Sequence, residues 1–520
     1  MSIRPTTSTT TSTTTTPAAF TRPARTKALA AGSGLALVLA MTASTTWAAG
    51  PAQADAKALT VYNVKSYGAT GNGSTIDTPA INKAIAAASA AGGGEVLFPA
   101  GTYESVSIHL KSNVEIYLDS GATIRGAASG YDAPEANSYS QYQDYGHSHF
   151  HDSLIWGDSL TNVSFAGSGT IDGDGHLKTG TPASGQADHA IAITRSSDVS
   201  FTGITVKNGG WIAILLNGVD HLAISDFNVQ TASDRDGIDV INTQNVTVSD
   251  TTIDSVDDSL VFKSDFALGR TYPNQNVTVT DVTASSNNNA FQFGSETCGD
   301  FTNYSFSHLT VDAAGKAGLG IVSMDGAHIT DVKYDDVTMK DAATPIFIKI
   351  GDRGRCPGTP GPGSISGITF DNVTGTGLSD LGANYTSTIT GMPGHPVSDV
   401  TVENVHLTVP GGDPASDATI DPPTDYTSYV PKDLGTRPSY GWWLRNTSAI
   451  SFESDSVGFD KNDGRPAFVS DDGANVTLDD VTVQRGSGSP YDVGYISSTG
   501  DSVTGSKTTT GSSLRVHTSS

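Results

Sequence analysis

A short phrase of residues recurs along this chain and constrains its fold more than any other feature of the sequence. From about residue 160 onward, a polar residue begins a run of alternating apolar and polar positions, and a second alternating run follows. Copies of the phrase begin 23 residues apart at Asp198 and His221, and 31 residues apart at Asn245 and Asn276. A period of this length indicates stacked structural repeats.

Alternation with a period of two predicts β-strands that have one apolar face. A single coil cannot bury that face, whereas a stack of coils can. The sequence therefore predicts an all-β fold, a right-handed parallel β-helix. Leucine-rich repeats fit less well because the fixed Leu and Asn consensus and the helices are missing, and propeller blades need roughly 40 residues.

The first coil of such a stack needs a cover at its open end. Asp77, Thr78 and Pro79 offer a helix N-cap and a proline in the first turn, and Ile81 and Ile85 then fall on one helical face. Three glycines at 92–94 would end the helix. We therefore expect a short N-terminal capping α-helix that uses Asp77 as its N-cap.

The first 54 residues lie outside the repeat and resemble an export signal. Arg22, Arg25 and Lys27 precede an apolar stretch from Ala28 to about Met41, and small residues follow. The apolar stretch is too short and too rich in Gly and Ala for a membrane span. We expect residues 1–54 to be a signal peptide and disordered N-terminus, 55–510 a single β-helix domain, and 511–520 a flexible C-terminal tail, in a secreted, extracellular protein without a membrane partner.

The formal net charge of −25 argues against a nucleic-acid partner, which would require a basic face. An anionic ligand would have to bind through a local basic patch. The chain has two cysteines, Cys298 and Cys356. One disulfide and two separate buried thiols both remain open.

Two acidic clusters in the middle coils are the candidates for chemistry. Asp236 and Asp239 belong to the first, and Asp257 and Asp258 form the second, 21 residues after Asp236. This spacing is about one coil, and coils stack about 4.8 Å apart. Asp236 should therefore lie beside the Asp257–Asp258 pair on one outer face, provided that the chain turns or bulges at the doublet.

Three carboxyl groups in one small volume would titrate as a coupled set, with at least one raised pKa. Glycoside hydrolysis needs such a set, because one carboxyl must protonate the leaving oxygen and another must activate water. Two other interpretations of the spacing remain open: a ladder of aspartates at turns and an adventitious Ca²⁺ site.

Several segments together resemble glycoside hydrolase family 28, the polygalacturonase family. The segments "DRDGIDV" and "VDDSLVFKS" are similar to the family's Asn-Thr-Asp-Gly-x-Asp and Gly-Asp-Asp motifs and stand at a family-like interval. The opening "VKSYGATGNGSTIDTPAINKAIAAASAAGGGEVLFPAGTY" is similar to the N-terminal segment of β-helix pectinases. The likeness covers about residues 61 to 375.

The resemblance implies roles for residues at matching positions. Asp257 would be the general acid, Asp236 and Asp258 would hold and activate the water in an inverting hydrolysis, and Asp239 would support the site. Lys349, in "IFIKIG", matches the lysine of the family's Arg-Ile-Lys motif and would bind a substrate carboxylate.

The sequence departs from the family at two positions that help to hold galacturonate. Asn289 stands where the family has a histidine, and Phe347 replaces the arginine. We expect Asn289 to contact substrate all the same, and Arg353 and Arg355 to restore the missing positive charge, although loop arginines are often only solvated. Glu296 is a further candidate for substrate contact.

These observations predict a hydrolase that cleaves pectin-type polysaccharides, galacturonan or rhamnogalacturonan, without a metal or other cofactor. Its partner would be an acidic plant cell-wall polysaccharide, and we expect the protein to be a monomer. A polysaccharide lyase on the same fold and a non-catalytic carbohydrate-binding β-helix are the alternatives.

Overall fold

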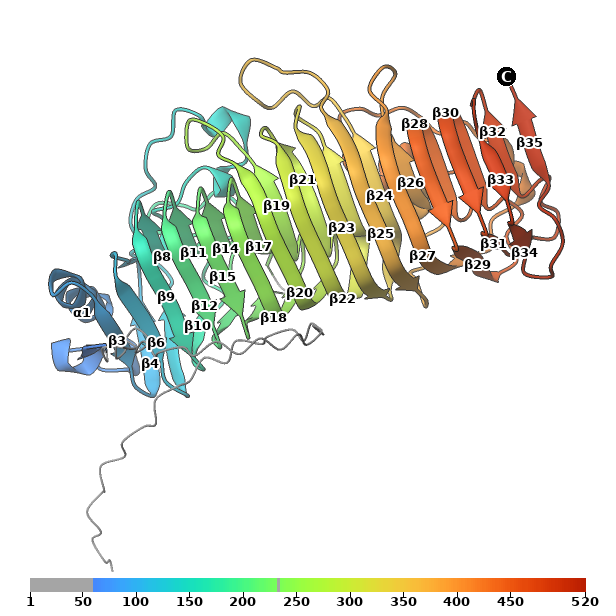
Figure 1. Cartoon of the computed structure of the whole chain (residues 1–520). Coiled ribbons are helices and arrows are strands. Elements are labelled where there is room, and N and C mark those ends of the chain that lie inside the picture. The colour runs from blue at the N-terminus through green and yellow to red at the C-terminus, as the bar shows by residue number, and fades with distance from the viewer. Residues whose placement is uncertain (1–58, 232–233) are drawn as a thin grey trace, which may run out of the picture. The chain divides into compact units, whose positions relative to one another are not determined.

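Strands of successive coils pair in parallel along the described part of this chain, and strands in the interior of the stack pair with the coil before and the coil after (Figure 1). The structure is a computed structural model and describes residues 59–231 and 234–520. Within them, 35 strands and one α-helix succeed each other. The predicted parallel β-helix is confirmed, whereas the predicted signal peptide lies outside the described residues.

One sheet carries the candidate residues, and long loops cover its outward side, so we call it the loop-covered sheet. Its strands in coil order are β8 (Ser153–Asp158), β11 (His189–Thr194), β14 (Ile212–Asn217), β17 (Asp236–Ile241), β19 (Leu260–Ser264), β21 (Phe291–Thr297), the C-terminal part of β22 (Phe301–Ser323), β24 (Ala342–Ile350), β26 (Ser387–Thr390), and the N-terminal parts of β28 (Trp442–Glu453) and β30 (Phe468–Asp479), followed by β32 (Val493–Ile496) and β35 (Val516–Ser519).

The other strands complete the coils. They are β1 (Val61–Asn63), β2 (Asn72–Ile76), β3 (Gly94–Phe98), β4 (Gly101–Ser105), β5 (Ile108–His109), β6 (Val114–Leu118), β7 (Ala122–Gly126), β9 (Thr161–Gly167), β10 (Thr170–Asp172), β12 (Ser197–Thr202), β13 (Thr205–Lys207), β15 (Asp220–Ser225), β16 (Asn228–Thr231), β18 (Gln244–Ser255), β20 (Asn274–Ser286), β23 (His328–Met339), β25 (Ser364–Gly375), β27 (Val397–Gly411), β29 (Ser456–Lys461), β31 (Thr482–Val483), β33 (Ser502–Thr504) and β34 (Lys507–Thr508).

The polar residue at the head of each phrase explains why the coils turn in register. Asn245, Asn276 and Asn303 have φ angles of 57°, 59° and 62°, in the left-handed region that asparagine tolerates well. Their side chains form a ladder, in which each Nδ2 donates to the Oδ1 of the asparagine one coil earlier at 2.9 Å. The recurring asparagine therefore sets both the turn and the stacking.

The inward positions of the phrase form a continuous apolar core. Aromatic rings stack at intervals of one coil, as in Phe306, Tyr334 and Phe370, whose successive ring centroids are 4.4 and 5.3 Å apart. All three side chains are buried. Stacks of this kind bury large apolar areas and hold neighbouring coils in register.

The predicted capping helix is α1 (Thr78–Ala90), which lies at the N-terminal end of the stack (Figure 1). Ile81, Ala84 and Ile85 are buried against the first coil, as expected. Asp77 precedes the helix, but its side chain makes no capping hydrogen bond. Its carboxylate instead accepts hydrogen bonds from the backbone of Thr70 and Gly71, so it fastens the preceding loop.

Loops cover the outward side of the loop-covered sheet around the middle coils. All six residues of β14 and all six of β17 are buried, although only alternate positions face the core. The loop at 127–152 reaches across to the loop at 265–273, where Asn137 donates to the carbonyl of Ala267 at 3.0 Å. The loop at 412–441 covers later coils, where its Pro422 carbonyl accepts from Arg445 at 2.7 Å.

Residues 516–519 of the C-terminal segment form a strand, and the flexibility expected of residues 511–520 stays a prediction. β35 pairs in parallel with β32 along four residues, because these residues continue the rungs of the loop-covered sheet. Among the described residues, we find no helix of the length and hydrophobicity needed to cross a membrane.

Candidate active site

The candidate residues lie where strands of the loop-covered sheet begin, and they form two columns across successive coils. In the first, which we call the inner column, Asp236, Asp258 and Asn289 follow one another. Backbone bonds set this register, because Gly237 donates to the Asp258 carbonyl at 2.8 Å and Ser259 donates to the Asn289 carbonyl at 2.9 Å. The Asn289 side chain donates to Asp258 Oδ1 at 2.7 Å.

The second column, which we call the rim column, contains Arg235, Asp257, Asn288 and Lys316. Asp257 N donates to the Arg235 carbonyl at 3.1 Å, and Lys316 N donates to the Asn288 carbonyl at 2.7 Å. The other three side chains converge on Asp257: Arg235 Nη2 lies at 3.2 Å, Asn288 Nδ2 at 2.8 Å and Lys316 Nζ at 4.0 Å. The side chains of Arg235, Asp257 and Lys316 are 35%, 17% and 18% exposed.

The two columns bring three carboxyl groups together. One oxygen each of Asp236, Asp257 and Asp258 lies within 4.8 Å of the other two. The doublet stands between the end of β18 at Ser255 and the start of β19 at Leu260, so the chain turns where both side chains must face the same side. The arrangement is the one that the 21-residue spacing predicted.

Lys263 lies behind the inner column and is the positive centre of the site. Its Nζ is 3.0 Å from Asp236 Oδ2, 2.7 Å from Asp239 Oδ2 and 3.9 Å from Asp258 Oδ2. It is also 3.0 Å from His147 Nε2, which contacts Asp239 at 3.1 Å. The Lys263 side chain is 3% exposed, so the sheet and its covering loops hold these charges away from water.

Burial separates the carboxyl groups by their pKa values. It raises the pKa of Asp236 to about 7 despite the attraction of Lys263, and the charges of Asp239 and Asp257 add to the rise. Burial, reinforced by Asp257 and Asp236, raises the pKa of Asp258 well above its usual value. Burial would also raise the pKa of Asp239, but Lys263 and His147 outweigh it and lower that pKa. Asp239 is therefore the ionised support, and Asp236 and Asp258 form a coupled pair that holds a proton more readily than an isolated aspartate.

The same contacts determine the pKa of Lys263. Burial alone would lower the pKa of Lys263, but Asp236 and Asp239 outweigh it and hold that pKa well above its usual value.

The set His147, Asp236 and Asp239 has the composition of a metal site, as does Asp236 with the aspartate doublet. In the first set, the Lys263 ammonium already supplies the positive charge that a metal ion would bring.

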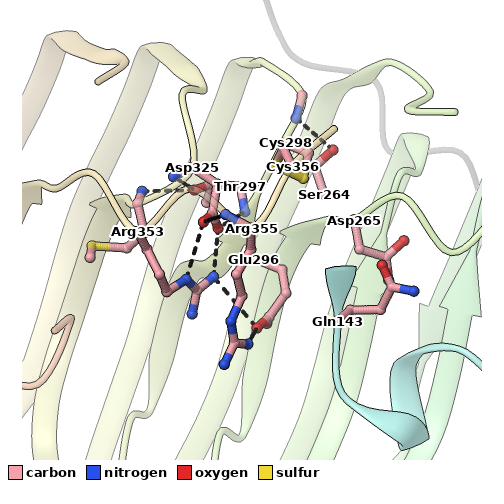
Figure 2. The surroundings of a disulfide bond; sticks show 12 residues. Gln143, Ser264, Asp265, Glu296, Thr297, Cys298, Asp325, Arg353, Arg355 and Cys356 are labelled. Carbon is pink, nitrogen blue, oxygen red and sulfur yellow. Dashed lines mark hydrogen bonds and ion pairs between the residues drawn. A yellow bond between two sulfur atoms is a disulfide. The ribbon is translucent and has the colours of Figure 1, made fainter. Parts of the chain in front are cut away.

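A disulfide joins the end of β21 to the loop that contains the predicted arginines Arg353 and Arg355 (Figure 2). Cys298 follows β21 and is bonded to Cys356, with their Cα atoms 5.6 Å apart, so the structure selects the disulfide over two thiols. Arg355 Nη1 donates to Glu296 Oε1 at 3.2 Å and is 38% exposed. The pKa of Glu296 is lowered because Arg353 and other nearby cations outweigh its burial.

Arg353, by contrast, is occupied by the protein itself. Its guanidinium contacts both carboxylate oxygens of Asp325, at 3.1 and 2.5 Å (Figure 2). It also donates to Ser295 Oγ at 3.0 Å. The side chain is 11% exposed. Its predicted role in restoring charge toward a substrate stays a prediction, whereas its role in holding the loop is evident from these contacts.

Lys349 lies on β24, three coils beyond Lys263 by strand register, which is about 14 Å. It is 2% exposed, and its ammonium donates to the carbonyl of Asp425 in the loop at 412–441. Burial lowers the pKa of Lys349 to about 8. Substrate binding by Lys349 stays a prediction and would require this loop to move. Phe347 is likewise buried, against Trp443 and other apolar residues.

Sequence reasoning missed Lys263, His147, Arg235 and Lys316. Lys263 carried a signal, because it lies in the quoted segment "VDDSLVFKS" on the strand that follows the doublet. Lys316 could have been found by counting one coil from Asn288. His147 comes from the long loop at 127–152, and nothing in the repeat predicts where that loop lies.

Comparisons with known proteins agree with the geometry. The model of the family described as "Glycosyl hydrolases family 28" matches residues 95–427, which include both columns. An exo-poly-alpha-D-galacturonosidase of Dickeya chrysanthemi is 27% identical over 253 residues, which are 39% of this chain and 42% of the relative, so the match spans less than half of that relative. A probable endo-xylogalacturonan hydrolase A of Emericella nidulans is 25% identical over 375 residues, with 68% of this chain and 88% of the relative covered.

Among solved structures, a family 28 exopolygalacturonase of Yersinia enterocolitica has a TM-score of 0.54 and 18% identity, covering 88% of this chain and 79% of that chain. At this identity the likeness shows the fold alone.

Proposed function

Because the chain belongs to glycosyl hydrolase family 28 and is therefore a glycoside hydrolase, we propose that it cleaves a pectin-type polysaccharide, galacturonan or rhamnogalacturonan, with inversion at the anomeric carbon. The observation that carries the proposal of acid–base hydrolysis is the cluster of three carboxyl groups, whose oxygens lie within 4.8 Å of one another. Inversion is proposed from the roles that the family resemblance implies for the three aspartates. Its partner would be an acidic plant cell-wall polysaccharide, and the enzyme would act as a monomer.

The exposed fractions of the three aspartate side chains support the different roles proposed for them. Asp257 belongs to the rim column and has the most exposed of the three carboxyl groups, at 17% against 4% for Asp236 and 10% for Asp258. A glycosidic oxygen that approaches from solvent reaches Asp257 first. Asp257 therefore donates the proton to the leaving oxygen, and the buried pair Asp236 and Asp258 acts on water.

The buried pair offers an oxygen for that water. Asp236 Oδ2 contacts Lys263 at 3.0 Å, while Asp236 Oδ1 is buried without a hydrogen-bond partner. A water molecule between Asp236 Oδ1 and Asp258 would satisfy this oxygen and face the anomeric carbon. The water oxygen bonds to that carbon as the bond to the leaving oxygen breaks and Asp257 gives its proton to the leaving oxygen. Because Asp236 and Asp258 titrate as a coupled pair, one of them is ionised when the other holds a proton, and that ionised carboxylate takes the proton of the water.

The alternative of a polysaccharide lyase needs a basic group that removes a proton from the sugar. Lys263, the buried lysine among these carboxylates, already contacts Asp236 and Asp239 at 3.0 and 2.7 Å and is 3% exposed, and Lys316 lies 4.0 Å from Asp257. These contacts support hydrolysis over elimination. Product absorbance in the ultraviolet separates the two reactions, because only elimination produces an unsaturated uronide.

Release of reducing ends from polygalacturonate and rhamnogalacturonan tests the proposal. Asp257→Asn should keep the fold and lose about 10²- to 10⁴-fold in rate, the usual contribution of a positioned proton donor. Asp254→Asn is a matched control, since Asp254 is a solvent-facing aspartate of β18 in the preceding strand. Full activity of Asp257→Asn, or no release by the wild type from any pectic polymer, would refute the assignment.

Secretion is part of the same proposal. The Cys298–Cys356 disulfide supports it, because disulfides persist mainly in oxidising compartments outside the cytosol. Sequencing the N-terminus of the protein recovered from culture medium should give a start near residue 50 or 55. Recovery only from the cell interior, with an intact N-terminus, would contradict it.

A further inference from the structure

The rim column carries more positive charge than its own carboxylate can balance. Arg235 and Lys316 approach the single carboxylate of Asp257 from opposite sides, at 3.2 and 4.0 Å. The backbones of the two residues are three coil steps apart along the column, about 14 Å, and their side chains converge on Asp257 between them. The chain as a whole carries −25, so this cationic pair at the entrance to a carboxylate cluster is a local exception.

The buried cations near the site are already engaged. Lys263 is buried between Asp236 and Asp239, at 3.0 and 2.7 Å. Arg353 is held by Asp325 and is 11% exposed. Lys349 is covered by the loop that contributes the Asp425 carbonyl. The positions that bind galacturonate in the resembled family carry the neutral residues Asn289 and Phe347 here.

Both rim cations rest on aromatic rings that keep them in place. The Arg235 guanidinium lies over Trp211, 4.9 Å from the ring centroid, and Lys316 Nζ lies over Tyr429, 5.2 Å from its centroid. Such contacts hold a side chain without neutralising its charge. Arg235 and Lys316 therefore remain electrostatically available to an incoming anion while their orientation is fixed.

We propose that Arg235 and Lys316 form a clamp for the carboxylates of two uronic-acid units, one on each side of the glycosidic bond that Asp257 protonates. The inference rests on the proposed function and specifies its substrate as a polymer with free uronic acids at these two positions. It also assigns to these residues the recognition that Asn289 and Phe347 cannot provide.

The test compares an oligogalacturonate that has free carboxyl groups with the same oligomer as its methyl ester. Arg235→Gln and Lys316→Gln should each lower kcat/KM for the free acid by about 10- to 100-fold, the range expected for losing one charged hydrogen bond. The same variants should lower kcat/KM for the ester by a smaller factor, so that the preference for the free acid over the ester falls. Equal losses on both substrates, or no loss on either, would overturn the clamp.

Lys333→Gln is the matched control, because Lys333 is 48% exposed, pairs with Asp335 at 3.3 Å and lies on β23, outside the loop-covered sheet. It removes the same charge and should alter neither value.

The affinity for the oligomer, measured by calorimetry, tests the clamp independently of hydrolysis. The free-acid oligomer should bind the Asp257→Asn protein, and adding Lys316→Gln should weaken that binding about tenfold. If the wild type cleaves neither oligomer, the proposed function fails, yet this binding difference still decides the clamp. Equal affinity with and without Lys316 would overturn it.

Discussion

Replacing Lys263 with methionine tests the electrostatic centre of the site. Methionine keeps most of the length and apolar volume of the lysine stem and removes the ammonium. Asp236 and Asp239 would then lose contacts of 3.0 and 2.7 Å in a region where the Lys263 side chain is 3% exposed. Removing one partner of a buried ion pair lowers the free energy of unfolding by about 3–5 kcal/mol. We expect the free energy of unfolding to fall by about this much at pH 7.

The sign of the pH dependence follows from the pKa shifts. In the wild type, the lowered pKa of Asp239 contributes stability above its unfolded pKa of about 3.9, and this contribution is lost as the pH falls through the folded value. Without Lys263, burial would raise the folded pKa of both carboxyl groups. A raised pKa costs stability as the pH rises above about 3.9, so the deficit of the variant should be largest at pH 7 and should shrink toward pH 4.

Urea unfolding followed by circular dichroism at pH 4 and pH 7 measures this difference. Lys333→Met, which removes an exposed lysine, should be close to neutral at both values. If Lys263→Met is equally destabilised at both pH values, lost packing explains the effect. An unchanged stability at pH 7 would refute the buried ion-pair arrangement.

Three further perturbations have defined outcomes. Asp258→Asn should abolish hydrolysis yet raise the urea midpoint of unfolding at pH 7, because burial raises the pKa of Asp258 and makes its ionised form costly. This gain in stability should vanish near pH 4, as urea titrations at the two pH values would show. Replacing both Cys298 and Cys356 by serine opens a loop of 58 residues and should lower stability by about 4 kcal/mol at most, measured by the same unfolding. Gly237→Ala should lower both stability and reducing-end release, because the added Cβ would lie 2.6 Å from the Ser259 carbonyl beside Asp236; unchanged activity would show that this backbone contact does not position the aspartate.

The repeat in the sequence was sufficient to predict the architecture, for physical reasons. Alternation fixes which side chains enter the core, and the recurring Asn245, Asn276 and Asn303 fix where each coil turns. Both effects are local, so the sequence displays them directly. The same regularity places Asp236 one rung from Asp258, which is why simple counting located the carboxylate cluster.

What counting could not predict are the contacts that loops make. His147 reaches Asp239 from the loop at 127–152, and the carbonyl of Asp425 reaches Lys349 from the loop at 412–441. A loop of this length has no period, and its position depends on the surface on which it packs. The motif resemblance accordingly gave Lys349 a role in binding substrate, whereas the structure shows its ammonium covered.

The cations at the rim show a different limit. Arg235 lies next to a predicted aspartate, and Lys316 is one coil beyond Asn288, so both positions were within reach of the sequence. The role proposed for Arg235 and Lys316 depends on their shared contact with Asp257, at 3.2 and 4.0 Å. Side-chain convergence of this kind requires coordinates.

The most direct test of the account is the configuration of the first product, followed by proton nuclear magnetic resonance during hydrolysis of an oligogalacturonate. If Asp236 and Asp258 hold the attacking water while Asp257 protonates the leaving oxygen, the newly formed reducing end must first appear with the inverted anomeric configuration. A retained configuration would mean that an aspartate attacks the sugar directly, which carboxyl oxygens within 4.8 Å of one another would permit, and it would contradict the assignment of Asp236 and Asp258 to water.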